Sequence, residues 1–128
     1  MTRESILSAL QSALYSFAGG RVYRSRKEQL PQLPAIVIRP ESEDELGEMV
    51  GCVDSRLTVA IEVYAKGDIP EQAAETTLNQ ILGVMRLADP LGLGPDVQIS
   101  HNRRITWNVD GYDDAQVVVL IEINYRNY

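Results

Sequence analysis

The sequence predicts an α+β fold in which a mainly antiparallel sheet of about four to five strands carries two helices on one face. Two stripes with helical spacing and several segments with two-residue alternation indicate this class, in the order α-β-β-β-α-β-β. Strands that follow one another through short loops favour antiparallel pairing, and helices with one apolar stripe each need a sheet face to cover it. At 128 residues, the chain is expected to form a single domain, residues 1–128.

The first helix is expected to begin after Thr2, which can cap it, and to end at Gly19 and Gly20. Residues 21–27 alternate basic and apolar side chains, which is typical of a short edge strand protected by its charges. Residues 35–38 predict a buried strand that Pro40 stops. The apolar stripe of the helix consists of Ile6, Leu7, Leu10, Ala13, Leu14 and Phe17.

The middle of the chain predicts a strand and the second helix. Residues 56–65 alternate, with Leu57, Val59, Ile61 and Val63 on one face. Asp68 and Glu71 have the spacing of a helix-starting capping box, and the helix is expected to end before Pro90. Its stripe consists of Ala74, Leu78, Ile81, Leu82 and Met85.

Strands are expected over residues 97–101, 104–109 and 115–125, with turn chemistry at Asp110–Gly111. In the last of these strands, Val118 and Leu120 fall on the face away from the helices. Together with Ala60 and Tyr64 they form a semi-apolar patch, which either packs under neighbouring loops or serves as a subunit interface.

An acidic segment over residues 41–55 is expected to form a loop. It contains six carboxylates and no basic residue before Ser55. A metal site, a solvated loop and a surface facing a repulsive or basic partner are the alternatives, and the segment lacks the ligand spacing of a calcium loop. The carboxylates are Glu41, Glu43, Asp44, Glu45, Glu48 and Asp54.

The remaining composition argues against an enzyme and predicts no cofactor and no metal. Cys52 is the only cysteine, so no intramolecular disulfide or cysteine-based zinc site can form. His101 is the only histidine and lacks a nucleophile motif, and the Gly92-x-Gly94 pair is followed by Pro95 rather than by a phosphate-binding helix. A net charge of −6 argues against a protein whose main task is to grip nucleic acid. The sequence shows neither a leader pattern nor a membrane-spanning apolar run, which predicts a soluble cytoplasmic protein.

Several short stretches carry a resemblance to a known family. They are residues 33–37 (LPAIV), the acidic segment, residues 61–64 (IEVY) leading into residues 69–71 (IPE), and an Asp-rich turn before the closing strand. In this order the chain resembles the tail terminator family of long-tailed phages, the minor tail protein U type of lambda-like viruses, over most of its length. Head–tail connector and tail-completion proteins share a similar layout and are the alternative.

The resemblance implies a non-enzymatic ring, typically a hexamer, that caps the tail tube, stops its polymerisation and presents a surface for the head. It implies three partners: the tail tube protein, a head-completion or connector protein, and DNA that passes without specific binding. It places the protein in the virion, at the head-proximal end of the tail, and in the host cytoplasm during assembly. A small cytoplasmic binding domain or enzyme, with its pocket between sheet and helices, is a third hypothesis from another class.

A ring requires two different complementary surfaces on each copy. The acidic residues Glu41, Glu43, Asp44, Glu45 and Glu48 are expected to line the channel or to meet a basic neighbour, with a plain solvated loop as the alternative. The residues expected at the subunit or tube interface are Arg21, Arg24, Arg26, Arg103, Arg104, Val118 and Leu120.

Overall fold

The computed structural model describes residues 2–24, 34–67, 69–87, 89–108 and 114–128. The predicted α+β class is confirmed, but the described residues form six strands rather than four to five. The elements in chain order are helix α1 (Arg3–Leu14), a 3-10 turn η1 (Tyr15–Ala18), β1 (Val22–Tyr23), β2 (Ala35–Met49), β3 (Cys52–Lys66), α2 (Pro70–Met85), β4 (Val97–Ile99), β5 (Arg104–Asn108) and β6 (Asp114–Asn127).

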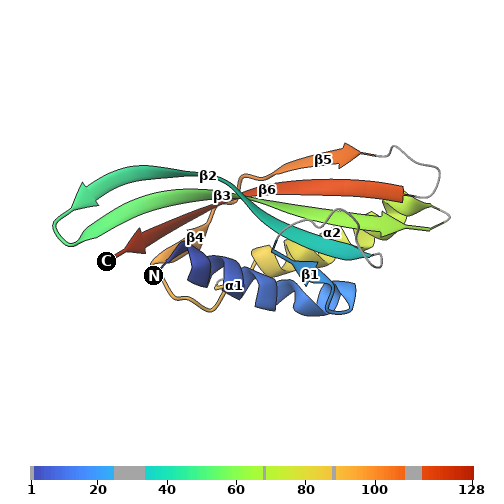
Figure 1. The fold of residues 1–128 in the computed structure, drawn as a ribbon, viewed down its shortest axis with the longest axis horizontal. Coiled ribbons are helices and arrows are strands. Elements are labelled where there is room, and N and C mark those ends of the chain that lie inside the picture. Colours follow the sequence, from blue (N-terminus) through green and yellow to red (C-terminus); the bar gives the residue numbers. More distant parts are fainter. Residues whose placement is uncertain (1, 25–33, 68, 88, 109–113) are drawn as a thin grey trace.

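All six strands belong to one sheet, in the order β1-β2-β3-β6-β4, with β5 also paired to β6 (Figure 1). Only β1 and β2 are parallel, and the other pairs are antiparallel. β4 and β5 share one edge of β6, because β4 pairs with residues 123–125 and β5 with residues 116–120. The sheet is therefore three long strands wide, with shorter strands at both edges.

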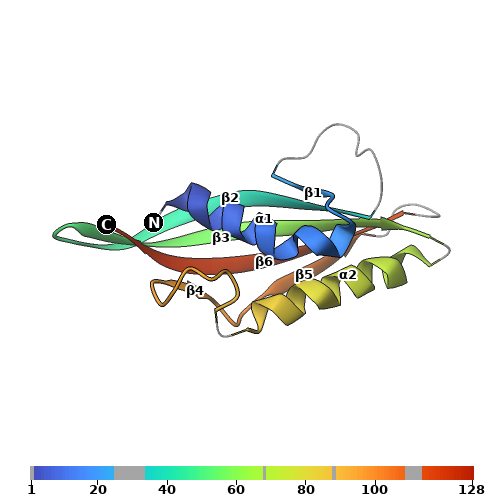
Figure 2. The ribbon, with the colours of Figure 1, turned by 90° about the horizontal axis from the view of Figure 1, so that it is seen from below.

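Both helices lie on the same face of the sheet, as predicted (Figure 2). The apolar stripe of each helix packs on alternate residues of the long strands. We call the side of the sheet that the helices cover the inner face, and the opposite side the outer face. The fully buried side chains of this core include Ile6, Leu10, Leu14, Ile36, Ile38, Leu57, Val59, Ile61, Ile81, Val119, Ile121 and Ile123.

The predicted start of the first helix is confirmed; α1 itself ends at Leu14, and the helical segment continues as the 3-10 turn η1 up to the predicted stop at Gly19. The Thr2 hydroxyl accepts a hydrogen bond from the Ser5 N–H at 3.1 Å, and the Ser5 hydroxyl completes a capping box. Gly19 has a φ of +60°, the left-handed conformation that ends a helix. The second helix instead begins after Ile69 without a side-chain cap. The predicted capping residue, Asp68, lies outside the described residues.

Two expectations about the segment after Ile38 are wrong. Pro40 does not stop the strand, and residues 41–55 are not a loop, because β2 continues to Met49 and pairs with β3 along its length. Pro40 is tolerated because β1 pairs only with residues 36–37, so β2 is an edge strand at residue 40. A register shift between Pro40 and Ser42 also interrupts the ladder there. Gly51, with a φ of +85°, closes the hairpin.

The first edge strand is shorter than predicted. Residues 21–27 were expected to be extended, and the structure shows β1 only at Val22 and Tyr23, with residues 25–27 outside the described part. The turn expected at Asp110–Gly111 also lies outside it. No helix in the described ranges is long and apolar enough to cross a membrane.

Candidate assembly surface

The acidic segment forms a projecting hairpin, which we call the acidic arm (residues 41–55). It extends beyond the first turn of α1 and lies near both termini (Figures 1 and 2). At about 3.3 Å per residue, the seven residue-to-residue steps from Glu43 to Val50 span about 23 Å. The arm therefore carries its tip well away from the helix-covered core.

On the inner face, Glu43 links the arm to α1 and to β6. Its carboxylate accepts hydrogen bonds from the Arg3 guanidinium of α1 and from the Tyr125 hydroxyl of β6. The hydrogen bond from Arg3 lowers the pKa of Glu43 below its ordinary value of 4.5. Burial, followed by the hydrogen bond to Glu43, raises the pKa of Tyr125 to about 12. The arm is thus anchored at its base to both a helix and a central strand.

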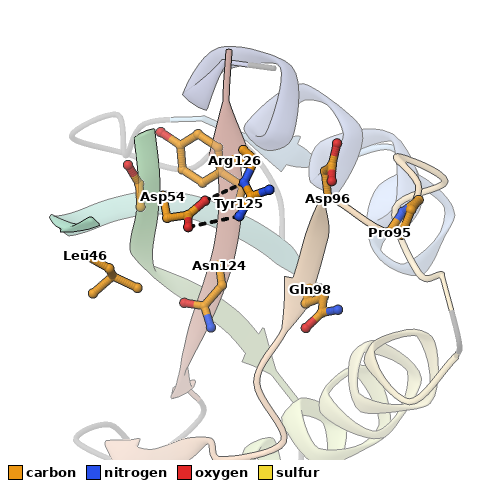
Figure 3. Close-up of a pocket in the computed structure, with 9 residues that line it drawn as sticks. Leu46, Asp54, Pro95, Asp96, Gln98, Asn124, Tyr125 and Arg126 are labelled. Atoms are coloured by element: carbon orange, nitrogen blue, oxygen red, sulfur yellow. Dashed lines mark hydrogen bonds and ion pairs between the residues drawn. The ribbon is translucent and has the colours of Figure 1, made fainter. Parts of the chain in front are cut away.

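On the outer face, Asp54 supplies a second anchor. Its carboxylate accepts two hydrogen bonds from Arg126 of β6, at 2.7 and 3.2 Å (Figure 3). The hydrogen bond from Arg126 holds the pKa of Asp54 below its ordinary value of 3.8. The pair borders a surface cavity of about 320 Å³ that is lined by Leu46, Asp54, Ser55, Pro95, Asp96, Gln98, Asn124, Tyr125 and Arg126.

The other carboxylates of the arm face solvent. Glu41 pairs with Arg39 at 2.7 Å. The remaining three are exposed and make no ion pair with any residue that the structure describes; we call them the free carboxylates (Asp44, Glu45 and Glu48). Beside them lies an exposed apolar tip, which the sequence analysis missed. It consists of Leu46, Met49 and Val50, which are 49%, 61% and 107% exposed.

Two of the predicted basic interface residues have partners inside the molecule. The Arg21 guanidinium donates to the Pro34 carbonyl at 2.8 Å. Arg24 makes two hydrogen bonds of 3.0 Å to Glu4, which lower the pKa of that carboxyl. Arg21 therefore links the start of β1 to the residue before β2, and Arg24 links the end of β1 to α1. Arg26 lies outside the described residues.

The second predicted basic pair borders a hollow on the outer face. This basic hollow, of about 330 Å³, is lined by Thr58, Asn102, Arg103, Arg104, Leu120 and Glu122. Arg103 donates to the Met85 carbonyl at 3.3 Å and so satisfies the C-terminal end of α2. Arg104 is exposed and has no ion-pair partner among the described residues. Arg56 lies 3.7 Å from Glu122 at the rim.

The patch predicted around Val118 and Leu120 contains a polar network that the sequence did not reveal. Both side chains are half-buried, and Ala60 is fully buried. Glu62, only 8% exposed, accepts hydrogen bonds from Gln116 at 3.1 Å and from Tyr64 at 3.3 Å. Alternation alone placed Glu62 on a solvent face. The one sequence feature that indicated partial burial of this face was the number of small and apolar residues around Glu62.

A second exposed apolar surface was also missed. Ile105 and Trp107 of β5 are 40% and 41% exposed, and Ile69 before α2 is 56% exposed. Trp107 and Ile69 border a hollow of about 550 Å³ whose other lining residues are Glu71, Gln72 and Glu75. This α2 hollow therefore combines apolar side chains with negative charge.

The described residues contain no group of three or more His, Cys, Asp and Glu side chains that can hold a metal ion. His101 lies exposed at a bend between β4 and β5, and Cys52 is half-buried beside the tip of the arm. The features that stand out are surfaces: an acidic arm with an apolar tip and a basic hollow on the outer face.

No protein-family model matches the chain, and no curated protein matches it by sequence. Its fold is similar to that of a solved chain from the virion of a native gene transfer agent particle. The TM-score is 0.58 with 13% sequence identity, over 95% of this chain and 98% of that chain. The two chains therefore share an α+β fold across nearly their entire lengths.

Proposed function

We propose that this protein is a structural component of a phage-like virion, and that within this class it acts as the tail terminator. The observation that carries the proposal is the end-to-end fold likeness to a chain of a gene transfer agent virion. Of the stretches that carry the resemblance to the tail terminator family, residues 35–37 lie in β2 and pair with residues 62–64 of β3. In this role a ring of six copies caps the tail tube and presents a surface for the head-completion or connector protein.

The surfaces of the chain support a ring. A cyclic assembly needs two unlike patches on each copy, each complementary to the other. The free carboxylates of the acidic arm and the arginines of the basic hollow are opposite in charge and lie on different parts of the molecule. Such a separation favours head-to-tail contacts over a symmetric pair of identical patches.

The overall charge supports passage of DNA through the ring. The chain carries 18 acidic and 12 basic side chains, and Arg21, Arg24 and Arg103 are engaged within the molecule. Affinity for DNA comes largely from basic groups that neutralise phosphates. A ring built from such a chain lets DNA pass without holding it.

Electron microscopy of the purified protein, alone and mixed with tail tubes, tests the proposal. We expect rings in solution and rings at one end of each tube, with tube lengths fixed once the protein is added. Rings that bind head particles and leave tubes uncapped would instead assign the protein to the neck, as a connector or tail-completion protein. A monomer that ignores both structures would refute a virion role.

A further inference from the structure

We propose that the acidic arm of one copy inserts its apolar tip into the basic hollow of the next copy in the ring. In this contact the tip packs on Leu120, and the free carboxylates pair with Arg104. The inference rests on the proposed ring and names the contact that closes it.

The apolar tip needs a partner outside its own chain. Leu46, Met49 and Val50 lie near the turn of the β2–β3 hairpin and are exposed rather than packed against the helix-covered core. The Glu43 and Asp54 anchors hold the arm from both faces, so the arm does not fold back. Thr58 of the hollow and Cys52 at the tip are six residues apart on β3, or about 20 Å. A copy therefore does not fill its own hollow.

Charge selects the basic hollow among the hollows that the described residues line. Its lining contains two arginines, Arg103 and Arg104, and a single carboxylate, Glu122, which itself lies 3.7 Å from Arg56. The α2 hollow carries Glu71 and Glu75 and no basic residue.

The hollow beside the start of α1, about 440 Å³, contains three carboxylates and one arginine. The cavity in Figure 3 has two aspartates and one arginine. An arm with three free carboxylates is repelled by these linings and attracted by the basic hollow.

Side chains, rather than strand addition, make this contact. The free edge of β2, which continues into the arm, contains Pro40, two register shifts and several carboxylates, and these features prevent edge-to-edge pairing. The tip and the hollow are different surfaces, so each copy offers one and receives the other. Repetition of such a contact closes into a ring when the rotation between copies allows it.

The test measures assembly by native mass spectrometry and sedimentation over a range of concentrations. Met49→Asp at the tip and Arg104→Glu at the hollow should each weaken assembly at least tenfold, with unchanged far-UV circular dichroism because both side chains are exposed. Arg103 is left in place because it satisfies the end of α2. Ile69→Asp, an equally exposed apolar-to-acidic change outside the contact, is the matched control and should assemble normally.

A charge swap separates a direct contact from a general effect of charge. Combining Arg104→Glu with Glu48→Arg should restore most of the assembly that Arg104→Glu loses. In a Cys52→Ser background, Val50→Cys and Asn102→Cys should be joined between copies by a short bismaleimide, giving a ladder of covalent oligomers.

Three outcomes would overturn the proposal. Rings that form normally with Met49→Asp and with Arg104→Glu would remove this contact and leave the ring and its terminator role intact. The contact would also be refuted if the single variants weaken assembly, the charge swap does not restore it and the cysteine pair gives no ladder of covalent oligomers. A parent chain that stays monomeric at every concentration and beside tail tubes would refute both the contact and the proposed function.

Discussion

Replacing Val119 with aspartate places a carboxylate in the middle of the core. Val119 is fully buried in β6, between Ile61 of β3 and Ile105 of β5. A buried, unpartnered carboxyl raises its pKa by up to about 3–5 units, and each unit corresponds to about 1.36 kcal/mol, so this effect costs about 4–7 kcal/mol. The lost burial of the valine side chain costs about 1.5–3 kcal/mol more. The sum is comparable to the entire stability of a typical domain, about 5–15 kcal/mol.

The neighbouring residue on the same strand supplies the control. Leu120 faces the outer side and pairs with Arg104, so Leu120→Asp places its charge beside a guanidinium at the surface. Denaturant unfolding followed by far-UV circular dichroism, at dilute concentration so that assembly does not contribute, compares the two variants. We expect Val119→Asp to be unfolded or nearly so without denaturant and Leu120→Asp to unfold cooperatively. A Val119→Asp midpoint equal to that of the parent would show that the inner face has been assigned to the wrong residues.

Three further predictions concern the arm. Because the pKa of Glu43 is lowered in the folded state, its stabilising contribution is present above the ordinary value of 4.5 and is lost as the pH falls below it. Glu43→Gln should therefore flatten the acid side of a plot of unfolding midpoint against pH, and an unchanged acid side would contradict the anchor. The pKa of Tyr125 is raised to about 12 in the folded protein, so its contribution to stability is present below the ordinary pKa of 10.0 and is lost as the pH rises through about 12. Tyr125→Phe should remove this loss of stability at alkaline pH. If the loss persists in the variant, another group causes it. Replacing the free carboxylates with lysine should abolish ring assembly and leave the fold unchanged. Rings that form normally and acquire salt-sensitive affinity for DNA, measured by fluorescence anisotropy, would place the arm in the channel instead.

Local signals were sufficient for most of the fold. The Thr2 cap and the Gly19–Gly20 pair delimit the helical segment made of α1 and η1, because capping and left-handed geometry depend on neighbouring residues only. The alternation in β3 and β6 identified the inner face because one side of each strand is covered by helices. Pro40 was wrongly predicted to end the strand because its effect depends on whether another strand pairs with β2 at residue 40. β1 pairs only with residues 36–37, and this depends on the tertiary structure rather than on the local sequence.

The candidate site was less accessible to sequence reasoning. Segregation of charge directed attention to the acidic segment and to the Arg103–Arg104 pair, and their role as interface residues stays a prediction. It did not reveal that Arg24 pairs with Glu4 or that Arg103 satisfies the end of α2, because these partners are distant in sequence. The apolar tip escaped notice because Leu46, Met49 and Val50 are scattered among charges, and their exposure depends on the hairpin that carries them away from the core.

The mass of the assembly formed by the purified protein tests the central claim most directly. Native mass spectrometry should show a species of about 86 kDa, six times the 14.3 kDa of one chain, and this species should be retained on tail tubes after sedimentation. A single 14.3 kDa species at all concentrations, with none carried down by the tubes, would contradict the account.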